Sequence, residues 1–372
     1  MAKKIGILTA GSDSPGINAT IRAIGKAALG AFGMDIVGFQ DGFLGLIENQ
    51  TIAIKDSLSG ILTSGGTILG TSRDLPYEIV QKDQVLDMTG RAVETYHKHN
   101  LEALVCIGGR ETQEAALKLI EKGLNVVTLP KAIDNDVNCT DQTIGFDTAM
   151  EIAAQSIDRL HSTAHSHHRI IIVEVMGRYA GWLTLGAGLA GGADVILIPE
   201  IPYDIQKVAE AILLRKQAGR GFSIVAVSES LVSLEQIAFS ERLRRMNALK
   251  RTEAEKERIE EQLEVIEGRR TDTTIQVSNQ LKELTGLETR ITILGYLLRG
   301  GAPSAADRIL ASELGTACVS LINDNQSGVM VAKQQGKVVP VPLDKVIGEH
   351  KLVPLDHLWV QAARRVGTNL GD

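Results

Sequence analysis

A sequence of 372 residues is too long for one ordinary hydrophobic core, so two domains are expected, and a hydrophobic content of 44% is enough to fill them. The net charge of −6 and an isoelectric point near 5.8 argue against a nucleic-acid-binding protein, which usually carries a basic excess. The three cysteines are scattered and fit a reducing compartment, and the chain shows neither a signal peptide nor a run of about 18 apolar residues. The sequence therefore predicts a soluble cytoplasmic protein that binds neither nucleic acid nor membrane.

Short apolar runs alternate with helix-length segments along most of the chain. The runs that we interpret as strands are residues 4–9, 35–39, 101–107, 124–129, 169–175, 194–198, 222–227 and 291–294. This alternation is the βαβ rhythm that is typical of an α/β fold with mostly parallel sheets.

Glycine-rich loops follow several of these predicted strands. The first loop, residues 6–19, reads GILTAGSDSPGINA and leads into a helix that is expected to begin near Ile17. Two further loops, residues 65–73 and 106–112, again combine glycine with arginine and small hydroxyl side chains. Glycine lets the main chain approach a phosphate group, and the N-terminus of a helix attracts the negative charge. Taken together, the loops indicate phosphate binding.

Two carboxylates, Asp134 and Asp136, lie in the segment PKAIDND directly after the apolar run 124–129. The carboxyl ends of buried parallel strands are where α/β sheets bind ligands. One carboxylate can accept a proton from a substrate hydroxyl while the other holds the Mg²⁺ that bridges phosphate oxygens. The alternative is an Asx-type turn that caps the next segment. The neighbouring phosphate loops favour the catalytic interpretation.

The order of the motifs resembles that of the phosphofructokinase family. The family patterns GGDxPGxNA, GTSR and GGDGT or GGEGT correspond to residues 11–19, 70–73 and 108–112. The patterns TIDND, VEVMGR and ETRxTxLGHxQRGG correspond to residues 132–136, 173–178 and 288–301. The resemblance extends over residues 4–333.

The resemblance implies two Rossmann-like three-layer α/β domains, with mostly parallel sheets and an active-site cleft between them. We expect a domain that binds the phosphoryl donor over residues 1–147 and a domain that binds fructose 6-phosphate over residues 148–302. The C-terminal segment, residues 303–372, is expected to pack back across both domains. The implied reaction is the glycolytic transfer of a phosphoryl group to the C1 hydroxyl of fructose 6-phosphate by a homo-oligomer, either a dimer or a tetramer.

The resemblance also assigns roles to single residues. Asp134 would be the catalytic base, Asp136 a ligand of Mg²⁺, and Arg178 and Arg73 would neutralise the transferring phosphoryl group. Lys131 would supply a further catalytic cation. The fructose 6-phosphate site would consist of Arg169, Met176, Gly177, Arg178, Glu229, Arg290, Tyr296 and Arg299, with Arg169 and Arg290 contributed by a neighbouring subunit. The donor phosphate site would consist of Gly11, Ser12, Arg73, Gly108, Gly109, Arg110, Glu111 and Thr112.

Several positions depart from the family pattern, mostly on the donor side. Arg110 replaces an acidic residue near Mg²⁺ and is expected to weaken the metal site unless it contacts a phosphate or pairs with Glu111. Glu111 would repel the α-phosphate of a nucleotide, and Lys131 would attract free pyrophosphate. The sequence therefore leaves ATP and pyrophosphate open as donors. The other departures are Ser12, Ala132, Ser230 and Tyr296.

The segment 233–285 is rich in charge and carries apolar triplets with i, i+4, i+7 spacing, which predict a pair of amphipathic helices broken near Gly268. It is interpreted as a solvated helical excursion, with a subunit or partner contact as the alternative. The stretch 186–191 matches GxGxxG but precedes a strand, so it is interpreted as a site of close helix packing.

The sequence is compatible with two hypotheses for the function of the protein. The first is a catalytic phosphofructokinase. The second is a non-catalytic homologue that keeps the sugar-phosphate or effector sites and acts as a regulatory or assembly subunit.

Overall fold

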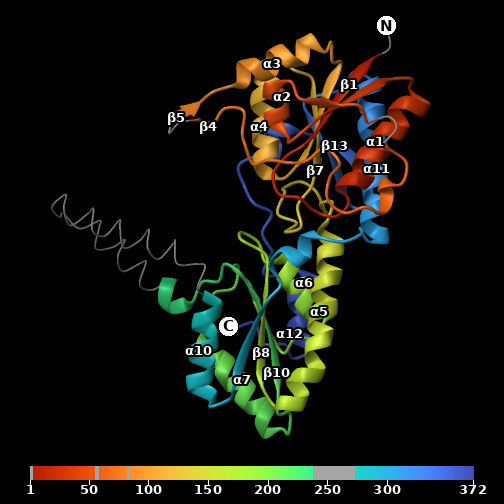
Figure 1. Ribbon diagram of the computed structural model, residues 1–372. Coiled ribbons are helices and arrows are strands. Elements are labelled where there is room, and N and C mark those ends of the chain that lie inside the picture. Colours follow the sequence, from red (N-terminus) through yellow and green to blue (C-terminus); the bar gives the residue numbers. More distant parts are fainter. Residues whose placement is uncertain (1–2, 55–57, 82–83, 238–272) are drawn as a thin grey trace, which may run out of the picture. The chain divides into compact units, whose positions relative to one another are not determined.

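The computed structural model describes residues 3–54, 58–81, 84–237 and 273–372 (Figure 1). The chain divides into two units, each built around its own sheet. Unit 1 combines Met1–Ala149 with Arg299–Lys351, and unit 2 combines Met150–Leu298 with Leu352–Asp372. Both units are α/β structures, as the sequence predicts.

The described strands of unit 1 are β1 (Lys4–Thr9), β2 (Asp35–Phe39), β3 (Thr51–Ile52), β4 (Ile79–Gln81), β5 (Gln84–Leu86), β6 (Ala103–Gly108), β7 (Val126–Pro130), β12 (Val329–Gln334) and β13 (Lys337–Pro342). Its described helices are α1 (Ile17–Ala31), α2 (Phe43–Glu48), α3 (Thr89–Lys98), α4 (Arg110–Glu121) and α11 (Ala305–Asn323), with the short 3-10 helices η2 (Ile61–Thr63) and η5 (Leu343–Lys345). Among the described residues, the main sheet has the order β13-β12-β7-β6-β1-β2-β3. Its edge strands β13 and β3 are antiparallel to their neighbours, and the strands between them are parallel.

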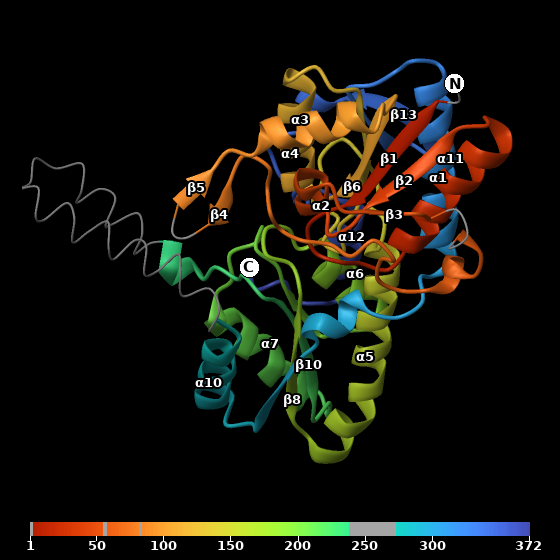
Figure 2. The same ribbon diagram turned by 45° about the horizontal axis from the view of Figure 1, so that its top comes forward.

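Helices cover both faces of this sheet (Figure 2). On one face, Ile21 of α1 and Leu314 of α11 are fully buried in a common apolar cluster. On the other face, Leu46 of α2, Ala92 of α3 and Leu119 of α4 form a second cluster. Because apolar residues cover both sides, every residue of the central strand β6 is buried.

The described strands of unit 2 are β8 (Ile170–Val175), β9 (Val195–Leu197), β10 (Ser223–Ser228) and β11 (Thr289–Ile293). Its described helices are α6 (Trp182–Ala190), α7 (Ile205–Gln217), α10 (Thr273–Thr285) and α12 (Leu358–Arg365), with the 3-10 helix η4 (Gly295–Arg299), whose last residue belongs to unit 1. Helix α5 (Phe146–His167) begins at the end of unit 1 and continues into unit 2. The sheet has the order β11-β8-β10-β9 in the described part of the unit, and all its pairs are parallel.

Unit 2 also has three layers. Ile212 of α7 and Leu281 of α10 pack on one face of the sheet. On the other face, a Cβ atom added at Gly188 of α6 would lie 2.7 Å from the side chain of Ile196. The prediction that the stretch 186–191 serves close helix packing is therefore confirmed.

All eight predicted strands are present, and their ends differ from the predicted bounds by at most two residues. The hairpin of β12 and β13 was missed. Its signal was available, because two strand-forming runs flank the two-residue loop Gln335–Gly336, in which both residues have positive φ.

The pattern predicted for residues 233–285 lies largely outside the described residues, including the two apolar triplets and the predicted break near Gly268. Within the described part of that segment, α10 buries Val277 and Leu281. Among the described helices, none is long and apolar enough to cross a membrane.

Candidate active site

Three neighbouring parallel strands of unit 1 end at the same edge of the sheet. Thr9 at the end of β1 pairs with Ile107 of β6, and Gly108 at the end of β6 pairs with Pro130 of β7. The segments that follow these ends carry the predicted residues Gly11, Ser12, Gly108, Gly109, Arg110, Glu111, Thr112, Lys131, Asp134 and Asp136. The fold therefore gathers the predicted donor and catalytic residues of unit 1 at one sheet edge.

Hydrogen bonds join the loop after β1 to the segment that contains Arg73. The amide of Gly11 donates to the carbonyl oxygen of Ser72 at 2.8 Å, and the hydroxyl of Thr71 donates to the carbonyl oxygen of Gly11 at 2.6 Å. The guanidinium of Arg73 donates to Oγ of Ser12 at 3.0 Å. Arg73 thus lies beside the first loop, where a cation for a donor phosphate was predicted.

Arg110 forms a salt bridge along its own helix, with Glu114 in place of Glu111, the partner considered from the sequence. Arg110 is the first residue of α4, and its guanidinium lies 2.8 Å from the carboxylate of Glu114. Neither a phosphate nor Glu111 is needed to balance its charge. Glu111 is exposed in the first turn of α4. Its carboxylate would therefore face a phosphoryl donor bound at this helix N-terminus.

Lys131 is buried, with 3% of its surface exposed. Its ammonium donates to the carbonyl oxygen of Ala10 at 3.1 Å and to that of Ser12. Burial, together with the nearby charge of Arg299, lowers the pKa of Lys131 to about 7. Arg299, which belongs to unit 1, donates to the carbonyl oxygen of Asp13 at 3.0 Å. Both cations therefore hold the backbone of the first loop.

The side chain between Asp134 and Asp136, the two carboxylates with predicted catalytic roles, fixes the loop. Asn135 has a positive φ of 52°, and its Oδ1 accepts a hydrogen bond from the amide of Thr143 at 3.0 Å. Its Nδ2 donates to the carbonyl oxygen of Asp141 at 3.2 Å. These bonds reach six and eight residues along the chain, so they hold the loop closed, with Asp134 and Asp136 on either side of Asn135.

Asp136 fits a limited role in metal binding. Its Oδ2 lies 3.4 Å from Nδ1 of His350. The described residues contain no cluster of three or more metal-ligating side chains. Mg²⁺ in phosphoryl-transfer sites is usually held by one or two carboxylates together with substrate phosphates and water. A single protein carboxylate at Asp136 matches that mode.

The predicted sugar site divides between two ends of the unit 2 sheet. At the carboxyl end, Val175 of β8 pairs with Ser228 of β10. Several predicted sugar-site residues follow the carboxyl ends of the strands: Met176, Gly177 and Arg178 after β8, Glu229 after β10 and Tyr296 after β11. Gly177 has a φ of 154°, and its carbonyl oxygen accepts a hydrogen bond from Oγ of Ser228 at 2.6 Å. A side chain at this position would be strained, so the glycine is required by the turn.

Arg169 and Arg290 lie at the opposite end of the same sheet. Arg169 directly precedes β8, and Arg290 pairs with Ile171 near the start of that strand. At about 3.3 Å per strand residue, the backbone of Arg169 lies about 20 Å from the carboxyl end of β8, where the loop with Arg178 begins. The carboxylate of Glu288 binds both arginines and its pKa is lowered, mainly by the hydrogen bond from Arg169. Unit 2 alone therefore does not bring all predicted sugar-phosphate residues together.

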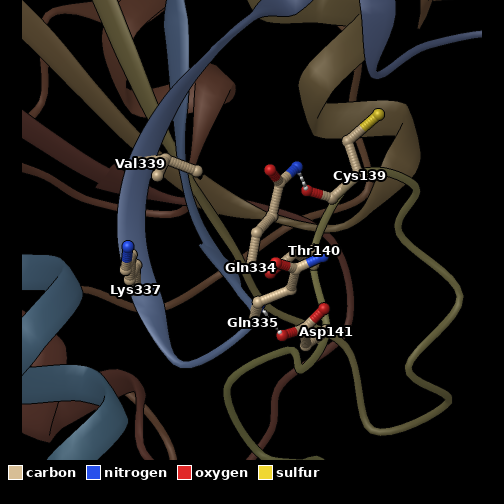
Figure 3. A pocket seen from close by; sticks show the side chains of 7 residues that line it. All are labelled: Cys139, Thr140, Asp141, Gln334, Gln335, Lys337 and Val339. Carbon is tan, nitrogen blue, oxygen red and sulfur yellow. Dashed lines mark hydrogen bonds between the residues drawn. The ribbon is translucent and has the colours of Figure 1, made fainter.

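A pocket of about 450 Å³ lies between the β12–β13 hairpin and the segment that follows Asn138 (Figure 3). Its lining residues are Cys139, Thr140, Asp141, Gln334, Gln335, Lys337 and Val339. Nε2 of Gln334 donates to the carbonyl oxygen of Cys139 at 2.8 Å, and the amide of Gln335 donates to the carboxylate of Asp141 at 2.6 Å. None of the sequence motifs includes these residues.

The chain is an α/β protein with two three-layer units, and the glycine-rich loops of unit 1 meet at the carboxyl edge of its parallel sheet, where such folds bind their ligands. The phosphofructokinase family model matches residues 4–322. A relative from Propionibacterium freudenreichii, named ATP-dependent 6-phosphofructokinase, is 48% identical over the full length of both chains. A relative of the same name from Spirochaeta thermophila is 45% identical over all of this chain and 98% of its own.

Among solved structures, phosphofructokinase from Pichia pastoris in the T-state has a TM-score of 0.76 and 29% identity. The match covers 93% of this chain and 35% of the Pichia chain, so the present chain spans about a third of that relative. The chain belongs to the phosphofructokinase family, as the motifs predicted.

Proposed function

We propose that this protein transfers the γ-phosphoryl group of ATP to the C1 hydroxyl of fructose 6-phosphate. The full-length similarity to two chains named ATP-dependent 6-phosphofructokinase carries the proposal. The same relatives disfavour the alternative of a non-catalytic regulatory or assembly subunit. A cytoplasmic location remains a prediction from the sequence.

In the proposed reaction, the C1 oxygen attacks the γ-phosphorus while the bond from that phosphorus to the bridging oxygen of ADP breaks. Asp134 accepts the proton of the C1 hydroxyl as general base. Arg73 and Arg178 balance the charge of the transferring group, and the backbone amides at the N-terminus of α4, after β6, bind the donor phosphates. Mg²⁺ held by Asp136 would neutralise charge on the phosphate oxygens of the donor.

For the acceptor, we propose that Gly177, Glu229 and their neighbours bind the sugar. Arg169 and Arg290 bind the 6-phosphate group of the fructose 6-phosphate molecule that occupies the site of a neighbouring subunit. The separation of about 20 Å along β8 supports this division, because one unit 2 cannot present both groups to one small molecule. Guanidinium groups suit the task, since they bind phosphate in a bidentate manner and remain charged. The active species would then be a homo-oligomer.

The charges near the donor loop include some that favour ATP as the phosphoryl donor and one that favours pyrophosphate. The ion pair with Glu114 neutralises Arg110, which removes one objection to a metal–nucleotide complex. Backbone carbonyls take two of the three hydrogen-bond donors of the Lys131 ammonium, which reduces its capacity to bind free pyrophosphate. Glu111 is the observation that favours pyrophosphate, because its carboxylate would repel a nucleotide α-phosphate. Pyrophosphate is therefore the second candidate donor.

The test is to measure fructose 1,6-bisphosphate formed by the purified protein with Mg²⁺ and fructose 6-phosphate, with ATP and pyrophosphate in separate assays. Turnover with ATP at least about tenfold above that with pyrophosphate is expected. Turnover with pyrophosphate alone would overturn the donor assignment. If the protein binds fructose 6-phosphate in calorimetry but shows no turnover with either donor, the result would support the alternative of a non-catalytic homologue.

A further inference from the structure

A short C-terminal segment, residues 350–353, contacts a loop of predicted function in each unit. It lies beyond residues 4–322, which the family model matches, and none of the sequence motifs includes it. The division between the units falls within it, after Lys351. We call residues 350–353 the strap.

In unit 1, the strap pairs with the loop that carries Asp134 and Asp136. His350 forms an antiparallel bridge with Val137, and its Nδ1 lies 3.4 Å from Oδ2 of Asp136. The amide of Lys351 donates to the carbonyl oxygen of Asp136 at 3.0 Å. The strap therefore contacts both the backbone and the carboxylate of the proposed metal ligand.

The ammonium of Lys351 adds a second attachment further along the same loop. It donates to the carbonyl oxygen of Thr140 at 2.8 Å and to that of Asp141 at 2.6 Å. The amide of Asp141 in turn donates to the carbonyl oxygen of Lys333 at 2.7 Å. Hydrogen bonds to a charged donor are stronger than neutral ones, so this lysine restrains the end of the catalytic loop.

In unit 2, the strap meets the loop after β8 through Glu200. The amide of Val353 donates to Oε1 of Glu200 at 2.9 Å. The same carboxylate accepts from the amide of Gly181, at 2.9 Å to Oε1 and 3.1 Å to Oε2. Gly181 ends the loop that begins with Gly177 and Arg178, and helix α6 starts at the next residue. Glu200 thus connects the strap to the predicted sugar-binding loop.

We propose that the strap is a positioning element for phosphoryl transfer, in which Lys351 orients the Asp134–Asp136 loop and Glu200 orients the Gly177–Arg178 loop. This inference rests on the proposed function. The alternative is that the strap only stabilises the fold. The two differ in their kinetics, because a loss of positioning changes kcat and KM selectively, whereas a loss of stability lowers the amount of active protein.

The kinetic test uses Lys351→Met and Glu200→Leu, with kcat calculated per mole of folded protein so that a smaller folded fraction does not lower it. Lys351→Met should lower this kcat at least about tenfold and leave the KM for fructose 6-phosphate within about threefold, since the loop that it releases carries the proposed base. Glu200→Leu should raise that KM at least about fivefold, because it releases the sugar-binding loop. Glu200→Gln keeps an oxygen acceptor and should recover most of the affinity. Lys345→Met is the matched control, because Lys345 is exposed and close in sequence, and it should behave as the wild type.

A second measurement does not depend on activity. Hydrogen exchange of peptides that cover residues 135–143 should accelerate at least about tenfold in Lys351→Met, while exchange of residues 177–183 stays unchanged. Glu200→Leu should give the reverse pattern. If the wild type shows no phosphofructokinase activity, this pattern still supports positioning of the two loops, and only the proposed function fails.

Two results would overturn the proposal that the strap positions these loops. One is a kcat for Lys351→Met within twofold of that of Lys345→Met. The other is exchange that rises evenly over the whole chain in either variant, because that pattern indicates a general loss of stability.

Discussion

The guanidinium of Arg110 lies 2.8 Å from the carboxylate of Glu114, one turn further along helix α4. Because of this ion pair, Arg110 and its neighbour Glu111 are expected to affect donor binding differently. Arg110 has its charge balanced, while Glu111, next to it, faces solvent in the first helical turn. The resistance of the site to a nucleotide is therefore expected to come from Glu111.

The corresponding prediction is that Glu111→Gly raises kcat/KM for ATP by about fivefold, since removal of one partly solvated negative charge near the α-phosphate is worth on the order of 1 kcal/mol. Arg110→Ala, which leaves Glu111 in place, should change it by less than about threefold. The measurement is steady-state kinetics with ATP at saturating fructose 6-phosphate. An equal gain from both substitutions would mean that the ion pair does not balance Arg110.

A second prediction concerns the proposed base. Asp134→Asn should lower kcat by at least about a hundredfold with a small change in KM, as expected when a general base is lost. Asp344→Asn, on an exposed residue outside the loops, serves as the control. Thermal denaturation of both variants tests for loss of the fold. Near-normal turnover of Asp134→Asn would assign the proton to another group.

Local patterns were sufficient to predict much of the fold. The strands of residues 4–9 and 35–39 were predicted at their observed bounds, because each is a short apolar run next to a glycine or polar boundary. The contact of Arg110 was also within reach of sequence reasoning. Residues i and i+4 face each other on a helix whereas neighbours do not, so Glu114 was a better partner than Glu111.

Contacts between distant parts of the chain could not be predicted in this way. Lys351 and Thr140, which share a hydrogen bond, are 211 residues apart in the sequence. A lysine near the C-terminus has no local signal that identifies its partner, since the partner is a backbone carbonyl that every residue possesses. The burial of Lys131 was missed for the same reason, because its acceptors belong to Ala10 and Ser12.

A third prediction follows from the burial of Lys131, whose pKa is lowered to about 7 from 10.5. Between these two values the unfolded chain binds more protons at this residue than the folded chain does. The free energy of unfolding should therefore rise with pH across this window, by up to about 1 kcal/mol per pH unit from this residue alone. Below about pH 7 both states are protonated and the contribution is flat.

Urea unfolding at pH 7 to 10 measures this effect as a difference between variants. Lys131→Met should flatten the rise relative to the wild type, while Lys337→Met, on an exposed strand position, should preserve it. The difference removes the contribution of other groups that titrate in the same range. Parallel curves for wild type and Lys131→Met would show that the ammonium is not desolvated in the folded state.

The last prediction tests whether the sugar-phosphate site is shared between subunits. Arg290 and Glu229 belong to opposite ends of the unit 2 sheet, so a shared site takes one residue from each of two subunits. Arg290→Ala and Glu229→Gln should each lower kcat/KM for fructose 6-phosphate at least about tenfold. In a hybrid of the two variants, one site receives both defects and the other receives neither. Random re-pairing of equal amounts should then restore about a quarter of the wild-type activity. Unfolding and refolding the mixture, with each variant refolded alone as the control, provides the measurement, and a mixture no more active than the mean of the two controls would place both residues in the same subunit's site.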